Sequence, residues 1–228
     1  QKEGAFGFWN LETCIFNSDL ISTKSADNLA SCAVILATLE RLCRQNSKAD
    51  LWGLFTRAEE VGFIGAGGIV ESNTIPKNVP IVVLETSKEL PGAEIGNGPV
   101  IRVGDRLSTF DSQIEFSIHS LAKNLKKTKN NFRFQRQLMS GGTCEASLYM
   151  LSGLTVGALA FPLRNYHNLG KRWPTEEIIS ASDAESMIQL CTGLALQPPS
   201  RKIPTSVKRQ LSEEFKSKSH RLTKKQHF

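Results

Sequence analysis

The stretch that decides the fold is Leu54-Phe55-Thr56-Arg57-Ala58-Glu59-Glu60-Val61-Gly62-Phe63-Ile64-Gly65-Ala66-Gly67-Gly68. The apolar run Asp50–Thr56 predicts a buried strand, and glycine-spaced apolar residues over Val61–Val70 predict a helix. Between them stand two adjacent carboxylates. Like charges this close raise the pKa of one of them unless a cation or hydrogen-bond donors intervene. Glu59 and Glu60 therefore either bind a metal or a proton, or form a solvated pair at a strand exit.

Further along the chain, apolar strands alternate with helical patterns. Ile81–Leu84 and Leu154–Leu163 are apolar without polar alternation, which is typical of strands covered on both faces. Other expected elements are a strand over Phe132–Leu138 and helices over Leu29–Cys43, Thr109–Lys126, residues up to Leu151 after a glycine turn, and from about Ser182 to Leu196. This order predicts an α/β fold: a three-layer αβα arrangement with a mixed, largely parallel sheet.

The 228 residues, 40% of them apolar, suffice for one full hydrophobic core. The net charge of +6 is uneven, because residues 200–228 contain nine Lys and Arg and two Glu. We therefore expect a folded domain over 22–198 and a flexible basic tail over 199–228. The tail lacks interleaved aromatic residues, which makes it a weak nucleic-acid signal.

The five cysteines are widely spaced and contain no CxxC pair, which indicates reduced thiols. No apolar run is long enough to predict a membrane span, and no signal peptide opens the chain. We expect a cytoplasmic protein that does not bind membranes.

Polar residues stand beside the apolar runs at five places: Asp27, Glu59, Glu60, Glu85 and His167. Taken alone, Asp27 has the ordinary role of a helix N-cap. Carboxylates at the ends of strands, however, lie where open α/β sheets bind their ligands. Four carboxylates and one imidazole at one sheet edge need cations, and oxygen and nitrogen donors without thiolate suit zinc, cobalt or manganese. Such ions activate water and polarise a carbonyl, while an unligated carboxylate moves the proton.

Six motifs in order resemble the dinuclear zinc aminopeptidases of the glutamyl and deblocking type. They are Ala26-Asp27-Asn28, Thr56 to Ala66 with its paired glutamates, Glu85, Ile95-Gly96-Asn97-Gly98-Pro99, Gly141-Gly142-Thr143 and Pro162-Leu163-Arg164-Asn165-Tyr166-His167. The resemblance spans Ser22 to Leu196. It implies a hydrolase that removes residues from peptides with two divalent metal ions, zinc first and cobalt or manganese as alternatives, and that forms a homo-oligomer.

The resemblance also implies roles for single residues. Asp27 would bridge both metals, Glu60 and His167 would bind one, and Glu85 would bind the other. Glu59 would be the general base that takes a proton from the attacking water and returns it to the leaving amine. Gly141, Gly142 and Thr143 would line the substrate cleft, together with Arg164 and Tyr166.

Three departures from the family pattern bear on function. Glu85 stands where an aspartate is common. Thr143-Cys144-Glu145-Ala146 replaces Thr-Asp-Ala, which affects substrate preference. The H-x-D motif that supplies the first metal-binding histidine does not precede Asp27. The chain therefore resembles the C-terminal part of such an enzyme. The resemblance implies that 22–198 is the metallopeptidase catalytic domain and that 1–21 is a remnant of the inserted β domain or an N-terminal extension. The alternative is a catalytically degenerate protein of this fold that acts as a binding or assembly subunit.

Overall fold

The computed structural model describes residue 4 and residues 7–200 and 205–223. Its strands are β1 (Cys14–Asn17), β2 (Leu20–Thr23), β3 (Ile81–Lys88), β4 (Val100–Gly104), β5 (Gln135–Leu138), β6 (Val156–Leu163) and β7 (Glu177–Ser180). Its helices are α1 (Ala26–Arg44), α2 (Ile64–Glu71), α3 (Ser112–Thr128), α4 (Glu145–Leu151), α5 (Ala181–Leu196) and α6 (Thr205–Thr223), with a short 3-10 helix, η1 (Tyr166–Asn168).

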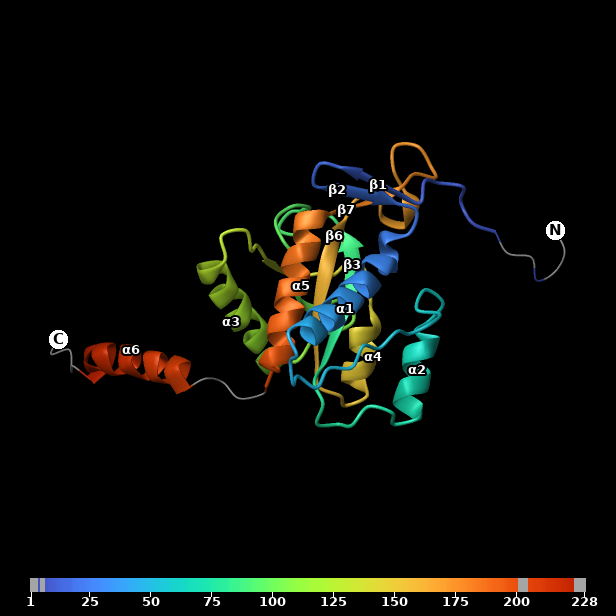
Figure 1. The fold of residues 1–228 in the computed structure, drawn as a ribbon. Coiled ribbons are helices and arrows are strands. Elements are labelled where there is room, and N and C mark those ends of the chain that lie inside the picture. Colours follow the sequence, from blue (N-terminus) through green and yellow to red (C-terminus); the bar gives the residue numbers. More distant parts are fainter. Residues whose placement is uncertain (1–3, 5–6, 201–204, 224–228) are drawn as a thin grey trace.

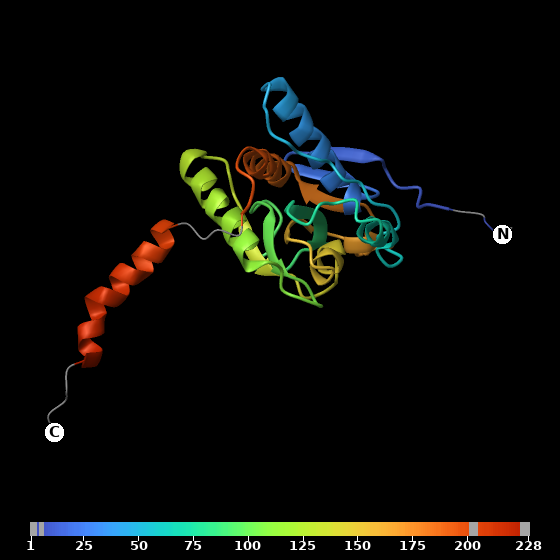
Figure 2. The ribbon, with the colours of Figure 1, turned by 90° about the horizontal axis from the view of Figure 1, so that it is seen from below.

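The main sheet has the strand order β3-β6-β4-β5. β3 pairs with β6 in parallel, and so does β4 with β5, whereas β4 and β6 run antiparallel. Helices α1, α3 and α5 pack on one face of this sheet, and α2 and α4 pack on the other (Figures 1 and 2). The predicted three-layer α/β fold with a mixed sheet is confirmed.

Every residue of β6 is buried, which shows that this strand lies at the centre of the structure. Two hydrophobic clusters flank the sheet. One joins it to α3 and α5 through residues such as Ile118 and Met187, and the other joins it to α2 and α4 through residues such as Ala66 and Tyr149. Apolar contact on both faces is the reason that β6 has no polar alternation in its sequence.

A second, three-stranded sheet has the order β1-β2-β7. Antiparallel pairing of β2 with β7 places Leu20 opposite Ser180 and Thr23 opposite Glu177. The segment before Asp27 is thus tied to the strand that leads into α5. Residues 1–3 and 5–6 of the proposed N-terminal remnant lie outside the described residues.

Two predictions about secondary structure are wrong. Asp50–Thr56 is not a strand: its backbone pairs with none of the described strands, Gly53 packs against Ile35 and Leu39 of α1, and Trp52 and Phe55 are 62% and 47% exposed. Glu85 does not follow its strand but lies within β3. The other predicted elements exist with shifted ends; α2, for example, begins at Ile64 rather than Val61.

The C-terminal segment contains α6, which extends away from the layered body (Figure 1). Residues 201–204 and 224–228 of the predicted tail lie outside the described residues. Within the described part of the chain, no helix combines the length and apolar character needed to cross a membrane.

Candidate metal centre and active site

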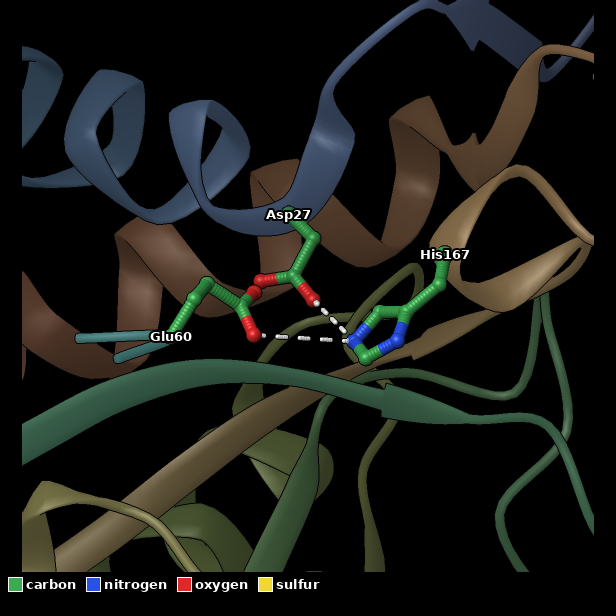
Figure 3. A group of neighbouring side chains, drawn as sticks. All are labelled: Asp27, Glu60 and His167. Atoms are coloured by element: carbon green, nitrogen blue, oxygen red, sulfur yellow. Dashed lines mark ion pairs between the residues drawn. The ribbon is translucent and has the colours of Figure 1, made fainter. Parts of the chain in front are cut away.

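Asp27, Glu60 and His167 come from three separate segments and point toward one another (Figure 3). Nε2 of His167 lies 3.7 Å from Oδ2 of Asp27 and 3.9 Å from Oε2 of Glu60. One ligand atom from each residue falls within 4.8 Å of the other two. Two carboxylate oxygens and an imidazole nitrogen at this spacing could hold one divalent cation of the zinc, cobalt or manganese type.

Asp27 is positioned by contacts around the start of α1. Its backbone N–H donates to Oε2 of the buried Glu177 at 2.9 Å, and the side chain of Asn28 donates to the carbonyl of Leu84 at 2.9 Å. The second bond ties α1 to β3 one residue before Glu85. The backbone of Asp27 is not helical, with φ −80° and ψ 106°, so the Asp27 side chain departs from the N-cap role and faces the cavity.

His167 lies in a tight turn in which Asn165, His167 and Asn168 all have positive φ, between 55° and 60°. Side-chain hydrogen bonds hold this turn: Asn165 donates to the carbonyl of Glu176, and Asn168 donates to those of Lys24 and Thr175. Left-handed backbone at non-glycine residues persists only where surrounding structure enforces it, and it gathers at functional sites. The ring of Tyr166 stacks on His167 with centroids 3.9 Å apart.

Glu59 and Glu85 complete the acidic cluster. Burial, and then the charges of Glu60 and Asp27, raise the pKa of Glu59 to about 7. Burial, and then the charges of Asp27 and Glu59, raise the pKa of Glu85 to about 8. Asp27 follows the same pattern, since burial and the charges of Glu60 and Glu177 raise its pKa to about 6. Carboxylates crowded in this way favour a bound proton or cation, which fits a metal centre.

A cavity of about 290 Å³ joins this cluster to the rest of the site. Besides Asp27, Glu59, Glu60 and Glu85, its lining includes the predicted residues Gly141, Gly142, Thr143 and Tyr166. Asp105 fixes the glycine turn on one side of the cavity, because its carboxylate accepts from the backbone N–H of Cys144 at 3.0 Å and from the hydroxyl of Ser147 at 2.8 Å.

Two predicted residues stand apart from these arrangements. Arg164 does not line the cavity; its guanidinium forms a two-pronged ion pair with Glu89, at 3.0 and 3.2 Å. Glu85 is not part of the three-residue ligand group, and among the described residues no histidine joins it there.

Sequence reasoning missed Arg102 and Cys144, which also line the cavity. Arg102 lies within the apolar strand β4 and Cys144 immediately before α4. A charged residue inside an otherwise apolar strand is the signal that could have identified Arg102, since a buried charge needs a partner.

Known proteins resemble this chain in sequence and in fold. The family model described as M42 glutamyl aminopeptidase matches residues 2–190. Similar solved structures include the TET aminopeptidase from the marine sediment archaeon Thaumarchaeota archaeon SCGC AB-539-E09, with a TM-score of 0.68 and 22% identity over 80% of this chain and 51% of that chain. Aminopeptidase APDkam598 from the archaeon Desulfurococcus kamchatkensis has a TM-score of 0.66 and 22% identity over 82% of this chain and 51% of that chain.

The Pyrococcus horikoshii TET1 peptidase, described as assembling into a tetrahedron or a large octahedral shell, has a TM-score of 0.66 and 22% identity over 82% of this chain and 53% of that chain. At these identities the likeness is one of fold. The present chain spans about half the length of these relatives.

Proposed function

Because this chain belongs to the M42 glutamyl aminopeptidase family, we propose that it is a metal-dependent exopeptidase that releases residues from the N-terminus of peptides. The observation that supports this most directly is the convergence of Asp27, Glu60 and His167 within 4.8 Å, beside the half-buried carboxylate of Glu59. The chain covers about half of its structural relatives, so the activity is proposed for the site as part of the whole protein.

In this proposal the cluster holds two divalent ions, zinc first. Asp27 would contribute to both ions, Glu60 and His167 would hold one, and Glu85 would hold the other. For the ion held by Glu60 and His167 the donors fit, since the ligand group found among the described residues offers oxygen and nitrogen atoms and no thiolate. When bound, the ions supply a Lewis acid for the scissile carbonyl and lower the pKa of water.

Glu59 is proposed as the proton carrier. It lines the cavity beside Glu60, but it is not in the three-residue ligand group. An unligated carboxylate whose pKa lies near neutrality is suited to take a proton from the attacking water and return it to the leaving amine. The two adjacent glutamates therefore have different roles in this proposal: Glu60 is a metal ligand and Glu59 carries the proton.

Gly141, Gly142, Thr143 and Tyr166 are proposed to line the substrate cleft, because they border the same cavity as the acidic cluster. Arg164 supports the cleft indirectly, since it pairs with Glu89, between the cavity residues Lys88 and Leu90. A homo-oligomer is proposed by analogy with the shells of the TET1 peptidase. Five free thiols support a cytoplasmic location.

The second candidate is a degenerate metallopeptidase-fold subunit that binds without catalysis. It is favoured by Glu85, which belongs to no group of three potential metal ligands among the described residues. Metal content separates the two proposals: two tightly bound ions per chain support the peptidase, and one or none supports the degenerate subunit.

The test combines metal analysis with a Glu59→Gln variant. The protein is loaded with Zn²⁺ or Co²⁺ and assayed with aminoacyl-anilides and short peptides. We expect Glu59→Gln to lower kcat by on the order of 10² to 10⁴, the usual contribution of a positioned proton carrier, with metal content unchanged. Glu71→Gln, an exposed change on α2, is the matched control. Unaltered activity in Glu59→Gln would reject the general-base role, and loss of metal would identify Glu59 as a ligand instead.

A further inference from the structure

Glu177 is a buried carboxylate beside the candidate metal centre. The residue begins β7, and its relative exposure is 2%. Its Oε2 accepts from the backbone N–H of Asp27 at 2.9 Å. Among the described residues this is the one hydrogen bond that the carboxylate accepts, and no lysine, arginine or histidine lies within ion-pair distance of it. A buried negative charge without a cationic partner is costly in general, which points to a role beyond packing.

The segment that contains Glu177 supports the candidate metal centre from two sides. Two side-chain hydrogen bonds, at 2.7 and 2.9 Å, join the turn around His167 to the backbone carbonyls of residues 175 and 176. Glu177 follows directly and holds Asp27. One short segment therefore connects two candidate ligands that are far apart in the chain, and Nε2 of His167 lies 3.7 Å from Oδ2 of Asp27.

Glu177 contacts the backbone of Asp27, which leaves the Asp27 carboxylate available to a cation. Asp27 is the second residue of α1, and the first N–H groups of a helix have no partner within the helix. A carboxylate acceptor satisfies this N–H with a charge-assisted hydrogen bond, which is shorter and stronger than a neutral one. Because φ and ψ of Asp27 are not helical, at −80° and 106°, the direction of its side chain depends on contacts such as this one.

We propose that Glu177 is a positioning residue, which fixes the backbone of Asp27 so that the Asp27 carboxylate faces Glu60 and His167 at metal-binding distance. This inference rests on the proposed metal centre. Contacts behind the ligands orient them, and the loss of such a contact typically lowers metal affinity by about 10- to 100-fold. In this role Glu177 binds neither metal nor substrate and acts through Asp27.

The experiment measures metal affinity in variants that separate the hydrogen bond from the charge. Glu177→Ala removes the acceptor. Glu177→Gln removes the charge but keeps an oxygen that can accept from the N–H of Asp27. Ile179→Ala is the matched control, because Ile179 is 5% exposed on the same strand and belongs to the hydrophobic core. Each full-length variant is first shown to be folded by circular dichroism.

Zn²⁺ affinity is determined by competition with a chromogenic chelator. We expect Glu177→Ala to lower it by about 10- to 100-fold, and Glu177→Gln and Ile179→Ala to stay close to the parent protein. The visible absorption of bound Co²⁺ gives a second readout, because it reports the geometry of the ligands. It should change in Glu177→Ala and resemble that of the parent in Glu177→Gln.

Three results would overturn the proposal. Unchanged affinity in Glu177→Ala would show that the contact does not matter for metal binding. Equal losses in Glu177→Ala and Glu177→Gln would assign Glu177 to charge balance, and an equal loss in Ile179→Ala would indicate general loosening of the fold. If Glu177→Ala does not fold, Glu177→Asp provides the test: its shorter side chain keeps the charge but should lose affinity, whereas Glu177→Gln keeps it.

Crystal structures of the metal-free parent, Glu177→Ala and Glu177→Gln separate this proposal from the proposed function. We expect the distance between Oδ2 of Asp27 and Nε2 of His167, 3.7 Å in this structure, to increase in Glu177→Ala and to be kept in Glu177→Gln. A displaced Asp27 in Glu177→Ala supports the positioning role even if no peptide is hydrolysed. An unchanged Asp27 overturns that role even if the protein is an active peptidase.

Discussion

Cys144 lines the cavity and contains the group that a nucleophilic thiol mechanism would use. Its surroundings oppose that chemistry. The side chain is 1% exposed, and burial raises the pKa of the thiol to about 12. Because the thiolate is the reactive form, Cys144 is expected to be inert and to act as a packing residue before α4.

We therefore predict a clear order of thiol reactivity in the native protein. A maleimide should modify the exposed Cys14 and Cys43 first and leave Cys144 unmodified until the chain unfolds. Peptide mass mapping at a series of times, with a urea-unfolded sample as the control for complete labelling, measures this order. Rapid native labelling of Cys144, with loss of peptidase activity, would contradict the assignment and reopen a thiol mechanism.

The sequence could indicate Glu60 and His167 as candidate ligands because each follows or precedes a recognisable local pattern. Glu60 precedes a glycine-spaced apolar run, and His167 follows a buried strand. The motifs that contain Asp27, Glu60 and His167 are far apart in the chain, and the fold brings these three residues together. Arg102 could not be assigned to the site in this way, because a sequence does not show which cavity a buried side chain borders or which acceptors lie nearby.

At the scale of elements, the strand predicted over Asp50–Thr56 illustrates the limit of local pattern. Its apolar residues favour extended backbone, and the segment packs beside α1. A strand, however, also needs a neighbour to complete its backbone hydrogen bonds, and β-propensity depends strongly on that context. No described strand supplies the pairing. The antiparallel placement of β4 against β6 is likewise set by non-local pairing.

The loop that leads into β4 gives a prediction at this scale. The buried carboxylate of Asp183 accepts from the backbone N–H groups of Gly96 at 2.8 Å and Gly98 at 2.6 Å. Both glycines have positive φ, at +83° and +90°, but a Cβ at Gly98 would lie 2.2 Å from the backbone of Arg133, whereas one at Gly96 meets nothing within 4 Å. Alanine at Gly96 should cost about 1–2 kcal/mol for the backbone conformation. Alanine at Gly98 should cost at least about 2 kcal/mol more because of the steric clash.

Urea unfolding midpoints of Gly96→Ala and Gly98→Ala measure this difference. Each variant is the control for the other, because both change the same loop and the same backbone region. Equal destabilisation would show that the segment around Arg133 moves aside, and that the loop does not fix the start of β4 rigidly.

At the scale of the whole molecule, the acidic cluster links folding to pH and to metal. The folded-state pKa values of Asp27, Glu59 and Glu85 are raised to about 6, 7 and 8. The folded chain therefore binds protons more tightly than the unfolded chain does. The corresponding contribution to stability is fully present below the unfolded pKa values, near 4, and is lost as pH rises through about 6 to 8. A bound cation would replace the protons and remove this loss.

We therefore predict that the metal-free protein becomes less stable between pH 5 and pH 8. One pKa unit corresponds to about 1.4 kcal/mol, so the buried Glu85 alone should contribute on the order of a few kcal/mol to the change in the free energy of unfolding. Urea titrations at pH 5 and pH 8, without metal and with Zn²⁺, measure it. Zn²⁺ should stabilise the folded state most at pH 8, where ligand carboxylates are ionised and protons compete least.

Glu85→Gln provides the decisive comparison, with the exposed Glu12→Gln as its control. The amide keeps the shape of the side chain but cannot ionise, so this variant should lose much of the pH dependence of the metal-free protein, and Glu12→Gln should keep it. A metal-free stability that is flat or rises toward pH 8 would mean that water or an unrecognised cation already compensates these acids. Repulsion among the ionised carboxylates would then not favour metal binding, and the proposed peptidase depends on that binding.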